Sequence, residues 1–216
     1  NSVEQAIIKR KSEEFAKALG VDVNWVDREH MKKKGGEYNK AYFNLANGQV
    51  YICLHNNSNL QDVYKSILHE AVAHKGLRKL FGDKFDQALD EIYAAANQKI
   101  RDQIDGLEYN NRREATEEYL ASIAENLDPE QKDFWKKVKS AISQLVRSIG
   151  IPLKLSDNDL RFILYSSARA LKKNPISTAQ TVVFGKRMRV NYFDDSPQTR
   201  LSEAEKQTET NLFLPM

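Results

Sequence analysis

A single cysteine, Cys53, stands among the 216 residues of the chain. One cysteine cannot form an internal disulfide, and a zinc cluster built on cysteine thiolates is likewise excluded. The first ten residues lack the positively charged start and apolar stretch that are typical of a secretory signal. We therefore expect a protein of a reducing compartment, the cytoplasm.

Long apolar runs are also missing, since none approaches the ~20 residues that a membrane span needs. The charge is nearly balanced, with 33 Lys and Arg against 30 Asp and Glu. Acidic residues are interleaved through most of the chain, so its short basic clusters predict solvated faces. We expect no membrane and no nucleic-acid partner. Hydrophobic residues make up 41% of the sequence, which is enough for a sizeable core.

The opening stretch predicts an amphipathic helix that stops at Gly20, and short β-rich runs follow it. We expect strands at residues 21–26, 41–45 and 49–54, with Asn47-Gly48 turning a hairpin between the last two. A strand that ends near Leu54 is expected to offer an edge to an extended peptide by strand addition. The expected sheet is small and mainly antiparallel.

From Ser58 onward the apolar residues follow the period of a helix, and Ser58 with Gln61 predicts a capping box. The helix that begins there is expected to break near Gly76. Further helices are predicted at residues 85–104, 112–127, 128–148 and 156–172. A small sheet followed by a mostly helical C-terminal half makes the fold class α+β.

The composition changes after Pro175. A small hairpin is expected around Gly185, followed by a polar stretch to the end of the chain. The sequence therefore predicts one domain over residues 1–175, and a hairpin with a flexible tail or linker over residues 176–216.

The segment from His69 to His74 carries the clearest chemistry. It holds two of only four histidines, with Glu70 directly after the first. Neutral imidazole binds zinc well, and a glutamate beside the first ligand can take a proton from a metal-bound water. The usual zinc motif is H-E-x-x-H on a helix, but this chain has H-E-x-x-x-H. The other two histidines, His30 and His55, are expected at the surface.

The extra residue has a geometric consequence. A four-residue step on a helix turns the side chain by about 40°, whereas a five-residue step turns it by about 140°. His69 and His74 can therefore reach one ion only if the helix departs from regular geometry. We predict a π-type bulge between Leu68 and Gly76 if both bind one metal. The alternative is a histidine pair that merely decorates an amphipathic helix.

A third ligand is expected from the downstream pair Glu117-Glu118. The helical wheel favours Glu117, which lies nearer the apolar stripe. Glu118 has Ala121 and Ser122 one turn later on its face, and small residues there would let the metal-bearing helix approach closely. A solvated acidic pair is the alternative, and the residues alone leave this choice open.

Three segments resemble the zincin-like metallopeptidase domain of large polyvalent proteins from phages and bacterial conjugative elements. They are residues 68–82 (LHEAVAHKGLRKLFG), 115–125 (ATEEYLASIAE) and 155–167 (LSDNDLRFILYSS). With residues 85–95 the resemblance spans most of residues 1–172. It implies a zincin-like fold, and a peptidase that processes its parent polypeptide or cleaves another protein. Such domains have glycine where this chain has Ala73.

A second resemblance, limited to two motifs, is to the dipeptidyl-peptidase III family, which also combines H-E-x-x-x-H with E-E-x-x-A. Carried over by position, it implies that His69, His74 and Glu118 ligate Zn²⁺ and that Glu70 is the catalytic base. We therefore expect a gluzincin-like zinc metallopeptidase acting on a peptide or protein substrate, with other domains of a mobile-element polyprotein as further partners. The alternative is a catalytically silent metal-binding or nucleic-acid-associated module of such a protein.

Overall fold

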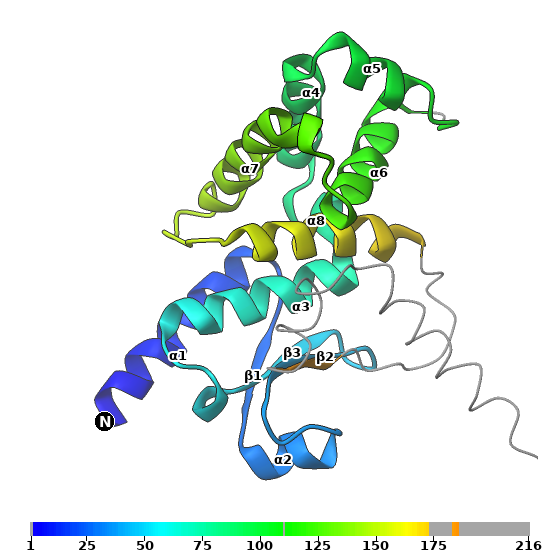
Figure 1. Cartoon of the computed structure of the whole chain (residues 1–216). Coiled ribbons are helices and arrows are strands. Elements are labelled where there is room, and N and C mark those ends of the chain that lie inside the picture. The colour runs from blue at the N-terminus through cyan, green and yellow to red at the C-terminus, as the bar shows by residue number, and fades with distance from the viewer. Residues whose placement is uncertain (1, 110, 173–182, 186–216) are drawn as a thin grey trace, which may run out of the picture.

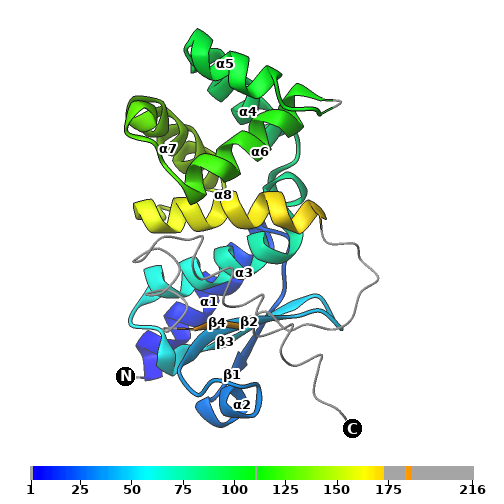
Figure 2. The same cartoon turned by 45° about the vertical axis from the view of Figure 1, so that its right-hand side comes forward.

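The computed structural model describes residues 2–109, 111–172 and 183–185. A small sheet lies in the lower part of Figure 1, with α1 (Ser2–Ala18) and α3 (Leu60–Phe81) on one of its faces. Helix α8 (Asp157–Lys172) lies across α3, and the remaining C-terminal helices pack on the far side of α8 (Figures 1 and 2). Helix α3 is therefore enclosed between the sheet and α8.

The sheet has four strands in the order β1-β3-β2-β4. They are β1 (Val23–Val26), β2 (Asn39–Asn44), β3 (Gln49–Cys53) and β4 (Val183–Gly185). Strand β2 pairs antiparallel with β3 and β4, which agrees with the expected sheet, whereas β1 pairs parallel with β3. Because β3 has a neighbour on each side, it offers no free edge to a peptide, and that expectation was wrong.

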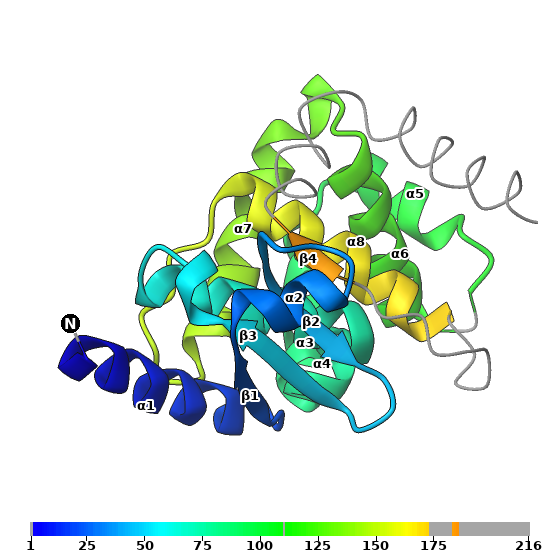
Figure 3. The ribbon, with the colours of Figure 1, turned by 90° about the horizontal axis from the view of Figure 1, so that it is seen from below.

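The predicted hairpin joins β2 to β3 through a four-residue turn, in which Gly48 has a φ of 70°. A short helix that the sequence did not predict, α2 (Arg28–Lys33), covers the face of the sheet turned away from α3 (Figure 3). His55 is exposed as expected. His30 is instead half-buried, with its Nε2 atom 2.7 Å from the Tyr42 hydroxyl oxygen.

The helices of the C-terminal half follow the predicted order, except that one predicted helix is divided into two. It comprises α4 (Asp83–Ala95), α5 (Gln98–Asp105), α6 (Arg112–Glu125), α7 (Lys132–Arg147) and α8. The single helix expected over residues 85–104 is two helices, because the Asn97 side chain accepts a hydrogen bond from the Ile100 amide and so caps a new helix. Likewise Asn59, and not Ser58, caps α3.

Helix α3 breaks where the sequence predicted. Gly76 has φ 74° and ψ 159°, outside the helical region, and the chain resumes a helix from Leu77. A Cβ atom at Gly76 would lie 3.4 Å from the carbonyl oxygen of Ser167 on α8. Both the positive φ and the close approach of α8 therefore favour glycine at this position.

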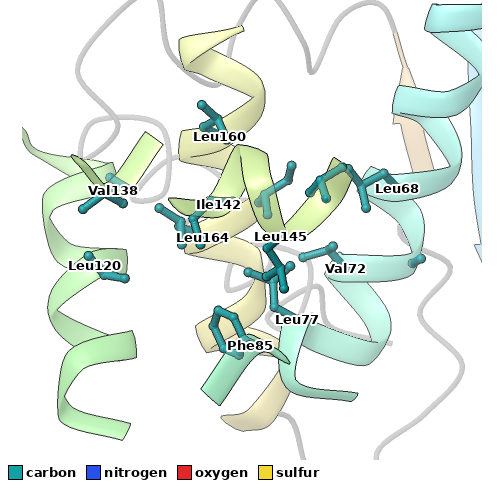
Figure 4. Packing of buried hydrophobic residues seen from close by; sticks show 14 of the residues in the cluster. Leu68, Val72, Leu77, Phe85, Leu120, Val138, Ile142, Leu145, Leu160 and Leu164 are labelled. Carbon is teal, nitrogen blue, oxygen red and sulfur yellow. The ribbon is translucent and has the colours of Figure 1, made fainter. Parts of the chain in front are cut away.

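The main apolar core joins the layers. Leu68, Val72 and Leu77 of α3 pack with Leu160 and Leu164 of α8 and with the inner faces of α4, α6 and α7 (Figure 4). Cys53 lies in a second, smaller cluster beneath α2. Among the described residues, no helix is both long and apolar enough to span a bilayer.

The structure is a mixed fold of a small sheet and many helices, as expected. The hairpin and tail predicted over residues 176–216 lie outside the described residues, except for β4, which pairs with β2.

Candidate metal and acid–base site on α3

Ionisable residues are buried along the middle of α3. His69 and Glu70 are each only 1% exposed. His74 lies on the following turn, with a side chain that is 7% exposed. Moving a charged group out of water costs several kcal/mol unless it is paired. The contacts of these three residues therefore indicate what the segment can do.

The side chain of His69 faces α8. Its ring centroid lies 4.7 Å from that of Phe162, and its Nε2 atom lies 3.3 Å from Oδ1 of Asp159. Both Phe162 and Asp159 belong to α8. His69 is thus held in the interface between α3 and α8.

Asp159 connects this histidine to other polar groups. Its Oδ2 atom accepts hydrogen bonds from the backbone amide and the hydroxyl of Ser156, and it lies 2.8 Å from Nζ of Lys65. Burial alone would raise the pKa of Asp159, but His69, Lys65 and Ser156 together hold this pKa well below its ordinary value. Asp159 is therefore a buried carboxylate at neutral pH.

His74 faces the sheet. Its ring stacks on Phe43 of β2, with centroids 4.4 Å apart and planes inclined by 10°. Its Nε2 atom lies 4.0 Å from Oε2 of Glu70, one turn earlier on the same helix. Glu70 and His74 therefore form an acid–base pair on the side of α3 that is turned towards the sheet.

The two histidines diverge, as a five-residue step on a regular helix requires. The departure from helical dihedrals within α3 falls at Gly76, after both histidines. The bulge that was predicted if both bind one metal is not present between His69 and His74 in this part of the structure.

Glu117 and Glu118 have different environments on α6. Glu117 is 3% exposed; its Oε1 atom accepts a hydrogen bond from the Ser167 hydroxyl at 2.9 Å, and Oε2 accepts one from Arg78 at 3.0 Å. Burial raises the pKa of Glu117, while Ser167 and Arg78 oppose the rise. Glu118 is half-buried. The helical wheel thus identified the more buried glutamate, and the choice of ligand stays a prediction.

Helix α8 occupies the place that the sequence assigned to α6. Helix α6 packs principally against α8 (Figures 1 and 2), and it meets the end of α3 through the hydrogen bond from Arg78 to Glu117. On α6, Ala121 is buried, but Ser122 is exposed. Asp159 and Ser167 were not among the predicted site residues, although both lie in the third of the motifs that carry the family resemblance.

The donor types on α3, α6 and α8 suit zinc. Within residues 2–109, 111–172 and 183–185, no three His, Cys, Asp or Glu side chains form a group that could hold a metal ion. His69, His74 and Glu118 are all among those residues. The assignment of these three residues as ligands of one zinc ion stays a prediction.

Comparisons with known proteins add no relative to the three motifs that carry the family resemblance. The resemblance therefore depends on those motifs alone, and what α3 can do chemically has to be inferred from its contacts. Searches with this chain against protein-family models, curated proteins and solved structures gave no match.

Proposed function

We propose that this chain is a zinc-dependent, gluzincin-like metallopeptidase domain with a zincin-like fold. Its ligands would be His69, His74 and Glu118, and its base Glu70. The observation that carries the proposal is the burial of Glu70 and both histidines on one helix in the centre of the molecule. Apolar residues would stabilise that position better than ionisable ones, so their presence favours a chemical role.

The position of Glu70 suits a base. Its carboxylate lies in the buried layer between α3 and the sheet, near His74. A carboxylate in such surroundings can take a proton from a hydroxyl group that is held within hydrogen-bond reach. The engagement of Glu117 by Arg78 and Ser167 also favours Glu118 as the glutamate of the pair that ligates metal.

The proposal requires a change in α3. His69 contacts α8 and His74 contacts the sheet, so one ion can be shared only if the turn between them departs from the regular helix. Ala71 and Ala73 are small and would obstruct such a change little. We place the domain in the cytoplasm, with a peptide or protein substrate and with other domains of a mobile-element polyprotein as partners.

Cleavage of a quenched peptide library, followed by mass spectrometry of the fragments, tests the activity. Wild type supplied with zinc should cleave, and Glu70→Gln should lose at least about 10²-fold in rate, the usual contribution of a general base. The exposed His55→Ala variant is the matched control and should retain activity. Equal cleavage by wild type and Glu70→Gln would exclude Glu70 as the base.

A second candidate is a catalytically silent module whose metal site is degenerate and no longer binds zinc, and the divergence of His69 and His74 favours it. In that case the contact of His69 with Asp159 is structural, and zinc should leave the protein unchanged. A ligand that binds only the folded state raises its stability, by about 2.7 kcal/mol at a concentration a hundredfold above the dissociation constant. An unfolding midpoint that does not move over a zinc titration would support the silent module.

A further inference from the structure

Helix α8 contacts α3 through polar groups at two points. Asp159, in its first turn, meets His69, and Ser167, two turns later, accepts a hydrogen bond from the Leu77 amide at 2.9 Å. Ser167 also donates to Glu117, so that one hydroxyl links α3, α6 and α8. The first of these contacts has a chemical consequence for His69.

The Asp159 carboxylate is fixed before it meets the histidine. Three donors converge on Oδ2: the Ser156 amide at 2.9 Å, the Ser156 hydroxyl at 2.7 Å and the Lys65 ammonium at 2.8 Å. The hydroxyl of Ser156 also accepts a hydrogen bond from the Asp159 amide, which completes a capping box at the start of α8. The other oxygen, Oδ1, is thereby turned towards His69.

We infer that Asp159 is a positioning residue for His69, which holds the ring against α8 and keeps a proton on Nε2. A carboxylate oxygen only 3.3 Å from Nε2 would repel a lone pair there, whereas it stabilises an N–H group. The acceptor nitrogen of the neutral ring is then Nδ1. A carboxylate that contacts the ring nitrogen not bound to metal fixes the tautomer of metal-binding histidines in this way. The relevance to a metal rests on the proposed function.

The tautomer can be measured directly on chelator-treated protein. With ¹⁵N-labelled histidine, long-range ¹H–¹⁵N correlation at alkaline pH distinguishes the protonated from the unprotonated ring nitrogen. The His69→Ala variant assigns the His69 signals among the four histidines of the chain. We expect wild-type His69 to be protonated on Nε2, and a ring protonated on Nδ1 would overturn the inference.

Asp159→Asn gives the sharper test. The three donors on Oδ2 hold the carbonyl oxygen of the new amide in place, so its NH₂ group faces His69. That NH₂ donates to Nε2, and the dominant tautomer should reverse to the form protonated on Nδ1. Asp157→Asn, two residues earlier on the same helix, is the matched control and should leave the His69 signals unchanged.

Each result distinguishes the inference from the proposed function. An unchanged tautomer in folded Asp159→Asn would show that Asp159 does not position His69. If that variant does not fold, the wild-type spectrum alone decides. Failure of the wild type to bind zinc, together with an Nε2-protonated His69, would defeat the zinc peptidase while the positioning role of Asp159 stands.

Discussion

His69 and His74 extend from α3 towards different layers of the molecule, His69 towards Phe162 of α8 and His74 towards Phe43 of β2. Five residues of regular helix turn the chain by about 500°, which leaves the two side chains about 140° apart. A metal shared by both would have to change this stretch of α3. We therefore expect zinc binding to change the structure of α3 between His69 and His74. A silent module that binds no zinc requires no such change.

The break in α3 should be sensitive to a single methyl group. Gly76→Ala places a Cβ atom 3.4 Å from the Ser167 carbonyl oxygen at a φ of 74°, so it combines backbone strain with close contact. We expect a loss of about 1–3 kcal/mol in the free energy of unfolding in urea. Gly48→Ala has a φ of 70° in open space and serves as the control for strain alone. Equal losses in the two variants would show that contact with α8 is unimportant.

Ser167 should matter more than its neighbour. Its hydroxyl is buried, accepts from the Leu77 amide and donates to Glu117, so Ser167→Ala leaves two buried groups without their partner. We expect this variant to lose about 1–3 kcal/mol of unfolding free energy. Ser166→Ala changes a half-buried serine on the same helix and should stay within about 0.5 kcal/mol of wild type. Similar losses in both would contradict the bridging role.

Asp157 should contribute stability that disappears in acid. Burial alone would raise its pKa, but Lys139, Trp135 and Arg161 hold the pKa below its ordinary value. A depressed carboxyl pKa stabilises the fold above the unfolded-state pKa of about 3.9, and this contribution is lost as the pH falls below it. Because its side chain is 43% exposed, Asp157→Asn should cost less than about 1 kcal/mol at neutral pH. The difference in unfolding free energy between variant and wild type should shrink below about pH 4, and a constant difference would exclude this charge effect.

Substitutions of Glu117 and Glu118 should affect different properties, thermal stability for Glu117 and zinc affinity for Glu118. Glu117→Ala removes the acceptor of Arg78 and Ser167, so we expect it to lower the thermal midpoint. Glu118→Ala should lower zinc affinity much more than Glu117→Ala does, as measured by competition with a chromophoric chelator. The opposite ranking in zinc affinity would identify Glu117 as the ligand and defeat the assignment carried over from the family resemblance.

The sequence predicted local structure well where a single residue determines it. The break at Gly76 needs a positive φ, and the turn at Gly48 does too, so both could be placed from glycine alone. The split between α4 and α5 was missed because Asn97 lies in a stretch that otherwise follows one helical period. A capping asparagine inside such a stretch is the signal that could have revealed it.

Tertiary placement was harder to predict. The sequence predicted a helix from residue 156, and Ser156 and Asp159 do cap α8, but nothing in their spacing places Asp159 beside His69. Periodicity gives the buried face of a helix without naming the helix that covers it. The sequence therefore paired α6 with the histidine helix, whereas α8 packs extensively against both helices and α6 meets α3 through the Arg78–Glu117 hydrogen bond.

The zinc content of the purified chain tests the central claim most directly. Protein dialysed against zinc and then against metal-free buffer should retain about one zinc per chain by elemental analysis, and His69→Ala and His74→Ala should each empty the site while His55→Ala keeps it. A wild-type chain that remains metal-free after exposure to excess zinc at neutral pH would contradict the account.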